Sequence, residues 1–157
     1  MSKGKSFLSA PEKTASGNEK RHLRIVITNP DAEFNQVVIS VTTLKCPNVQ
    51  DCSCILKAGD HQFITHDSIV DYKRTIIMSS VEIFNGINKG ILIDKQDVKP
   101  EILTRIINAA KQSRYIPPEI NNPDASVEVC CSHKVVAVGF NPLRYDASVG
   151  VLNPPRE

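Results

Sequence analysis

The chain has 157 residues, of which 41% are hydrophobic and 23% charged, and its formal net charge is +2 at pH 7. This length suits one globular domain with loose ends, and no run approaches the ~20 apolar residues of a membrane-spanning helix. A charge of +2 neither indicates nor excludes a nucleic-acid partner. The first twenty residues are polar and lysine-rich, without the apolar segment of a secretory signal. We therefore expect a cytoplasmic protein that does not contact a membrane.

The chain is predicted to consist of a leader, a packed body and an extension. Residues 1–20 lack apolar periodicity and are rich in Ser, Gly, Lys and Glu, which predicts a flexible leader. The body covers residues 21–116 and opens with a strand over residues 23–28, closed by the turn residues 29–31. The β-branched segment 36–44 predicts a strand that is buried on both faces.

Three more strands are predicted before the apolar period changes, at residues 53–56, 68–80 and 90–93. Five short strands in about seventy residues indicate a small barrel. From residue 99 to residue 114, apolar side chains recur at spacings of three and four, which predicts an amphipathic helix with Pro100 in its first turn. The fold class is therefore α+β and mainly β. Residues 117–157 are the predicted extension, in which residues 127–140 can form a hairpin.

Polar chemistry is concentrated in residues 54–72, where His61 and His66 lie between two apolar runs. Histidine is the side chain whose ordinary pKa lets it both accept and donate a proton near neutral pH. Gly59 and Asp60 are also typical of a tight turn. Functional and structural roles for this segment therefore both stay open.

A zinc site is the next candidate, because five possible ligands lie within twenty-one residues: Cys46, Cys52, Cys54, His61 and His66. Their spacing lacks the CxxC pairs of structural zinc sites, so we expect neither a metal nor another cofactor. An odd number of cysteines without an export signal also favours free thiols over a disulfide framework.

The order of the segments resembles the MazF/PemK-like family of type II toxin-antitoxin systems over about residues 21–115. The resemblance rests on LRIVITNP, a turn, VVISVTTL, a variable loop, HDSIVDYKRTIIMSS and the amphipathic helix. It implies a small Src-homology-3-like β-barrel with a C-terminal amphipathic helix, usually a homodimer. It also implies a toxin that cleaves single-stranded RNA and is neutralised by an antitoxin protein. The family begins with an apolar first strand, for which we find no counterpart before Arg21.

The resemblance also places candidate site residues. The hydroxyl residue of the family falls on Thr42, with Thr43 beside it. The basic residue of the family falls close to His22, flanked by Arg21 and Arg24. The usual Arg-Pro before this strand is replaced here by His-Leu at residues 22–23.

RNA cleavage without a metal needs a base for the 2′-hydroxyl proton, an acid for the leaving oxygen and groups that stabilise the phosphorane charge. We assign the acid and base to His22 or His66 and the charge to Arg24. Thr42 and Ser68 are expected to bind phosphate. Arg21, Thr43 and His61 complete the predicted binding residues. Residues 22 and 24 share one face of a strand, as a common site requires.

Two functions remain open from the sequence. The first is a toxin-like, metal-independent endoribonuclease. The second is a non-catalytic small barrel that binds a peptide or a nucleic acid, which a missing first strand favours because an open sheet edge can accept a partner's strand. Alternatively, residues 127–140 supply this strand within the chain.

Overall fold

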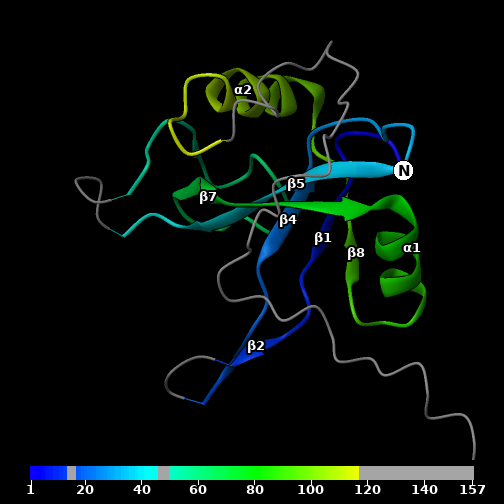
Figure 1. Cartoon of the computed structure of the whole chain (residues 1–157). Coiled ribbons are helices and arrows are strands. Elements are labelled where there is room, and N and C mark those ends of the chain that lie inside the picture. Colours follow the sequence, from blue (N-terminus) through cyan, green and yellow to red (C-terminus); the bar gives the residue numbers. More distant parts are fainter. Residues whose placement is uncertain (14–16, 46–49, 117–157) are drawn as a thin grey trace, which may run out of the picture.

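The structure, a computed structural model, describes residues 1–13, 17–45 and 50–116. These residues form β1 (Ser6–Leu8), β2 (Glu12–Lys13), β3 (Glu19–Lys20), β4 (Leu23–Val26), β5 (Asn35–Thr43), β6 (Ile55–Leu56), β7 (Ser68–Ser79), α1 (Ser80–Asn88), β8 (Ile93–Lys95) and α2 (Pro100–Ala110). Six strands make one antiparallel sheet in the order β6-β7-β5-β4-β1-β8, and β2 pairs with β3. The large sheet is curled, with α2 across one side and α1 beside β8 (Figure 1). The predicted class, α+β and mainly β, is confirmed.

The first strand is the main correction to the sequence prediction. β1 lies inside the sheet between β4 and β8, and Phe7 is only 1% exposed. The Nε2 of Gln36 donates a hydrogen bond of 2.8 Å to the carbonyl oxygen of Met1. The beginning of the chain is therefore packed, and the prediction of a flexible leader over residues 1–20 is wrong for residues 1–9. A strand of three residues next to Lys and Ser is too short for its apolar pattern to be recognised.

β1 is also a strand before Arg21, where the sequence predicted none. The hairpin predicted at residues 127–140 lies outside the described residues. Gly4 turns the chain into β1 with a φ of 94°, a conformation that favours glycine. Its N–H donates to the carbonyl of Val26, and its own carbonyl accepts from the N–H of Val98, both at 2.8 Å. The start of the chain is thus held by β4 and by the segment before α2.

The two longest strands form the centre of the sheet. β5 and β7 match the predicted strands 36–44 and 68–80 to within one residue at each end. Their register shifts between Val38 and Ser40, which marks a β-bulge. Ser40 is the Cα partner of Arg24 in β4 and of Asp71 in β7. Directly opposed residues of antiparallel strands share a face, so these three polar side chains lie on the same side of the sheet.

The two faces of the sheet are packed differently. On one face, residues of β4, β5 and β7 form the larger core with α2; they include Leu23, Ile25, Ile39, Val41, Val70, Tyr72 and Ile106. The Tyr72 hydroxyl donates to the carbonyl of Ile106 at 2.8 Å. The opposite face carries a smaller core of Phe7, Val26, Val38, Ile83 and Leu92 next to α1. Beyond this smaller core the second face becomes polar.

The helices show where the helical pattern predicts well and where it fails. α2 covers Pro100–Ala110, within the predicted range of residues 99–114, with Pro100 in its first turn. α1 was not predicted, although Ser79 caps it and Glu82 completes a capping box.

β6 falls within the predicted strand 53–56, and β8 begins where the predicted strand 90–93 ends. Neither helix of the described residues is long and apolar enough to cross a membrane.

Candidate functional site

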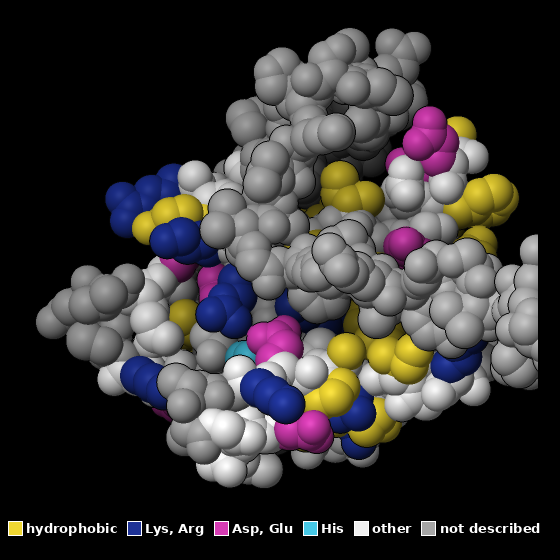
Figure 2. All heavy atoms as spheres, turned by 60° about the horizontal axis from the view of Figure 1, so that its bottom comes forward, with side chains coloured by type: hydrophobic (Ala, Val, Ile, Leu, Met, Phe, Trp, Pro, Cys, Tyr) yellow, Lys and Arg dark blue, Asp and Glu magenta, His cyan; other side chains and the backbone are white. Residues whose placement is uncertain are grey.

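A pocket of about 690 Å³ lies where the start of β4, the end of β5 and the loop before β7 meet. Its walls are formed by Pro11, Glu19, Lys20, Arg21, His22, Leu23, Val41, Thr42, Thr43, Gln62, Phe63, Ile64, Thr65, His66 and Ser68. Figure 2 views the molecule from the side on which β2 lies in Figure 1, and it shows a histidine between acidic and basic side chains. The pocket therefore combines titratable, hydroxyl and apolar groups.

Six of the eight predicted site residues line this pocket: Arg21, His22, Thr42, Thr43, His66 and Ser68. They come from segments far apart in the chain. Arg21 and His22 follow β3, the two threonines end β5, His66 lies in the loop before β7, and Ser68 is the first residue of β7. The fold therefore brings both pocket imidazoles and a pair of threonines to the same space.

His66 is exposed and held by hydroxyl groups. Its Nε2 lies 2.9 Å from the Oγ1 of Thr43, and its Nδ1 lies 3.1 Å from the Oγ1 of Thr65. A neutral imidazole donates from one nitrogen and accepts at the other, and a hydroxyl can serve either nitrogen. The Oγ of Ser68 donates to the carbonyl of His66 at 3.0 Å, which orders the backbone there. His66 is thus positioned and still accessible to a bound molecule.

His22 lies deeper in the wall of the pocket. Burial lowers the pKa of its imidazole from the ordinary value, and the positive charges of Lys20, Arg74 and Arg24 act in the same direction. Glu12 opposes them and raises this pKa, with its Oε2 3.9 Å from the Nε2 of His22. Because the pKa is lowered from 6.5, the ring is mostly neutral at pH 7. A neutral imidazole can accept a proton as a general base.

Arg24 does not line the pocket, which corrects the role that the sequence suggested for it. Its side chain is only 8% exposed, and its Nη2 lies 4.0 Å from the Oε1 of Glu12. Its Nη1 donates to the carbonyl of Arg74 at 3.1 Å. Burial lowers its pKa, but a guanidinium in a protein stays charged. Arg24 therefore lies behind the pocket wall as a buried positive charge next to Glu12.

His61 is a structural residue, and its predicted place in a binding site is wrong. It is 5% exposed, and its Nδ1 accepts from the N–H of Phe63 at 3.1 Å. Its Nε2 must then carry the hydrogen, which it donates to the carbonyl of Gln96 at 2.8 Å. The Oγ of Ser6 lies 3.1 Å from the same Nε2. His61 thus connects β1, the segment after β8 and the loop that carries His66.

Arg21 lines the pocket, but its guanidinium is partly committed elsewhere. Its Nη1 donates to the carbonyl oxygens of Ser9 and Ile91, at 2.9 and 2.7 Å. These bonds connect the approach to β4 with the ends of β1 and β8. Arg21 therefore stabilises the pocket wall through these bonds and also contributes a positive charge to the pocket.

Phe63 and Thr65 are pocket residues that sequence reasoning missed. Phe63 is 43% exposed, and the ammonium of Lys95 lies 5.9 Å from the centre of its ring. An aromatic residue in a polar loop between two histidines is a signal that could have identified it. Thr65 carries no such signal, because its contact with His66 depends on the conformation of the loop.

Metal-binding residues are not grouped in the part of the chain that the structure describes. No three His, Cys, Asp or Glu side chains among these residues could together hold a metal ion. Cys46 lies outside the described residues, and neither Cys52 nor Cys54 forms a disulfide within the described part of the chain. Burial raises the pKa of the Cys54 thiol, which keeps it protonated at neutral pH.

No protein-family model matches this chain, and no curated protein matches its sequence. The resemblance to the MazF/PemK-like family rests on the segments quoted for it.

Proposed function

We propose that the pocket binds single-stranded RNA and cleaves it without a metal ion, as a toxin-like endoribonuclease of a type II toxin-antitoxin system. One observation carries this proposal: His22, Thr42 and His66 line the same pocket. Two imidazoles in one accessible pocket can divide the acid and base roles that phosphodiester cleavage needs. The threonine hydroxyl can bind the phosphate between them.

The reaction assigns one role to each group. His22, kept neutral at pH 7 by its lowered pKa, takes the proton of the 2′-hydroxyl, whose oxygen then attacks the adjacent phosphorus. His66 donates a proton to the 5′-oxygen as its bond to phosphorus breaks. The Thr42 hydroxyl and the Lys20 ammonium stabilise the charge that develops on the phosphorane oxygens. The products are a 2′,3′-cyclic phosphate and a 5′-hydroxyl.

The size and lining of the pocket support a nucleotide as its ligand. Its volume of about 690 Å³ lies within the roughly 300–1,000 Å³ of ordinary small-molecule pockets. Phe63 offers a half-exposed ring, and unpaired bases stack on such rings. RNA recognition usually targets single strands, whose bases are free to enter a pocket.

The fold supports the same proposal. The curled sheet is proposed to be the small Src-homology-3-like barrel of the MazF/PemK-like family, and α2 its C-terminal helix. β1 favours this view because it provides the first strand that the segment order lacked. The partners that the resemblance implies, an antitoxin protein and a second copy of the chain, belong to the same proposal, as does a cytoplasmic location.

Incubation of the purified chain with single-stranded RNA in EDTA tests this function. We expect cleavage to persist in EDTA with 2′,3′-cyclic phosphate ends. His22→Ala and His66→Ala should each lower the rate by about 10²–10⁴-fold, the usual contribution of a general acid or base. Thr42→Val should also slow the reaction, whereas Thr104→Val, on the exposed side of α2, serves as its matched control. Absence of cleavage, or equal cleavage by both histidine variants and the wild type, contradicts the proposal.

A non-catalytic binding module for a peptide or a nucleic acid is the second candidate. The observation that favours it is that the Nη1 atoms of Arg21 and Arg24 donate to backbone carbonyls. Fewer N–H donors of these two guanidinium groups are then left to stabilise a phosphorane. RNA that binds to the chain, measured by fluorescence anisotropy, without being cleaved in EDTA supports this function over the first.

A further inference from the structure

Ser40 has an unused hydroxyl on the polar face of the sheet. Its Oγ is buried and has no hydrogen-bond partner among residues 1–13, 17–45 and 50–116. Ser40 lies opposite Arg24 in β4 and Asp71 in β7, so its side chain points to the face that carries both of them. Buried hydroxyl groups are nearly always hydrogen-bonded, and an exception needs an explanation.

Arg24, next to Ser40, has hydrogen-bonding capacity to spare. A guanidinium has five N–H donors, yet the only hydrogen bond of this one within the described part of the chain goes from Nη1 to the carbonyl of Arg74. The Nε of Arg74 lies 3.5 Å from Asp71. Asp71 therefore pairs with Arg74, although its charge also raises the pKa of Arg24. Among the described residues, no carboxylate accepts a hydrogen bond from the Arg24 guanidinium. A buried guanidinium is normally paired and hydrogen-bonded.

Glu12 is the acidic side chain that approaches this basic cluster. Its Oε1 lies 4.0 Å from the Nη2 of Arg24, and its Oε2 lies 3.9 Å from the Nε2 of His22. Both distances exceed a hydrogen bond, so the carboxylate faces two basic groups without binding either directly. The Glu12 side chain is partly exposed, and it comes from the β2-β3 pair, which lies outside the large sheet.

We propose that Glu12 covers a phosphate-binding subsite formed by Arg24, His22 and Ser40, and that an RNA backbone phosphate replaces its carboxylate. The RNA part of this inference rests on the proposed function, whereas the anion subsite rests on the geometry of these four residues. A phosphate has more acceptor oxygens than a carboxylate. It can come within about 2.7–2.9 Å of Nη2 and Nε2 in charge-assisted hydrogen bonds. Glu12 is then an internal competitor for the phosphate.

The subsite adds to the pocket because His22 belongs to both. In the pocket, His22 faces the space lined by Thr42 and His66. Its Nε2 also lies 3.9 Å from Glu12, whose other carboxylate oxygen lies 4.0 Å from the Nη2 of Arg24. A phosphate bound to Arg24 therefore sits next to the imidazole that acts as the base. This position suits the phosphate adjacent to the scissile one.

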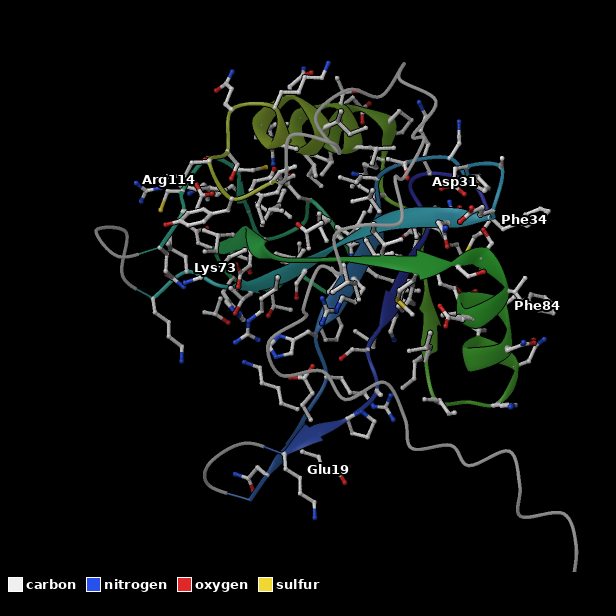
Figure 3. The ribbon with its side chains drawn as sticks, in the orientation of Figure 1. Glu19, Asp31, Phe34, Lys73, Phe84 and Arg114 are labelled. Atoms are coloured by element: carbon white, nitrogen blue, oxygen red, sulfur yellow. The ribbon has the colours of Figure 1, made fainter. Side chains whose placement is uncertain are left out.

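Glu12→Gln tests the subsite, with Glu19→Gln as the matched control. Figure 3 shows Glu19 on the β2-β3 pair, where it lines the pocket wall, whereas the ion pair of Arg24 is with Glu12. Both variants remove one negative charge from the same pair of strands. Two probes are titrated: inorganic phosphate, and a 2′-O-methyl RNA oligonucleotide without terminal phosphates, which cannot be cleaved by 2′-oxygen attack.

Glu12→Gln should bind both probes about tenfold tighter than the wild type, and Glu19→Gln less than about threefold tighter, because only Glu12 competes directly for the basic pair. Arg24→Gln in the Glu12→Gln background should remove the gain. Arg24 is buried, so folding of this variant is checked by thermal unfolding. His22 is less buried than Arg24, so His22→Gln in the Glu12→Gln background is the second variant. It should reduce the gain in affinity for both probes.

Equal affinities of Glu12→Gln and Glu19→Gln for both probes overturn the subsite, and so does a gain that survives both the Arg24 and the His22 change. A gain for inorganic phosphate alone overturns the assignment to RNA. These outcomes are independent of catalysis. If Glu12→Gln binds the probes more tightly and no variant cleaves RNA, the subsite stands and the endoribonuclease proposal fails. If RNA is cleaved but Glu12→Gln binds the probes no more tightly, the endoribonuclease proposal stands and the subsite fails.

Discussion

The two faces of the large sheet use the same strands for different purposes. On the face beneath α2, β4 and β5 place Leu23, Ile25, Ile39 and Val41 in one apolar core. On the opposite face the apolar residues stop after Val26 and Val38, and the strands continue with Arg24, Ser40 and Thr42. Alternate residues of a strand point to opposite faces. One face can therefore stabilise the fold, while the end of the other carries the Ser40 hydroxyl, which has no hydrogen-bond partner within the described part of the chain, and borders the pocket.

The largest change in stability is expected from Ile106→Ala, which tests the larger core beneath α2. Ile106 of α2 is fully buried in the larger core. Its truncation removes apolar contacts and leaves a cavity, so the free energy of unfolding should fall by about 2–5 kcal/mol. Urea unfolding followed by circular dichroism measures it. Ile93→Ala, at a 39% exposed position of β8, is the control and should cost less than about 1 kcal/mol. Equal losses at the two positions contradict the burial of Ile106 in the larger core.

An intermediate effect separates the two loop histidines. His61→Leu leaves the N–H of Phe63 without its acceptor and the carbonyl of Gln96 without the His61 donor. We expect a loss of about 1–3 kcal/mol in the free energy of unfolding. His66→Leu, at an exposed position, should change it by less than about 0.5 kcal/mol. The same unfolding experiment compares them. A larger loss for His66→Leu would show that the structural and exposed roles are reversed.

The smallest expected effect is a pH dependence that comes from His22. The pKa of this imidazole is lowered in the folded chain from 6.5, so the unfolded chain binds more protons as the pH falls below that value. The titration of His22 should not change the free energy of unfolding above pH 6.5. This free energy should decrease as the pH falls through 6.5 and should become constant below the pKa of His22 in the folded chain. His22→Gln should remove this part of the pH profile. Glu12→Gln should lower the pKa further, because Glu12 raises it. An NMR titration midpoint above 6.5 contradicts this.

The long elements of the fold could be predicted from the sequence. β5, β7 and the start of α2 have apolar or β-branched patterns that extend over nine or more residues. β1 could not be predicted, because three residues carry too little pattern and their burial depends on pairing with β4 and β8. α1 could have been predicted from the capping box of Ser79 and Glu82. It was missed because the β-branched run before it was extended as a strand through Ser80.

The pocket was predictable only where strand order determines it. Thr42 and His22 lie together because β4 and β5 are neighbours, which the two consecutive apolar runs indicate. The burial of Arg24 and His61 could not be predicted. It depends on Glu12 and Ser6, which lie in the region where no strand was predicted. Sequence reasoning thus found the titratable groups but could not separate accessible from buried ones.

His22 and His66 are proposed to serve one RNA site from which His61 is excluded. The most direct measurement is an NMR titration of the imidazole resonances with the uncleavable 2′-O-methyl RNA oligonucleotide, assigned by single histidine variants. We expect the His22 and His66 resonances to shift together with one apparent Kd, and the His61 resonance to keep its chemical shift. A shift of only one pocket histidine, or an equal shift of His61, would contradict it.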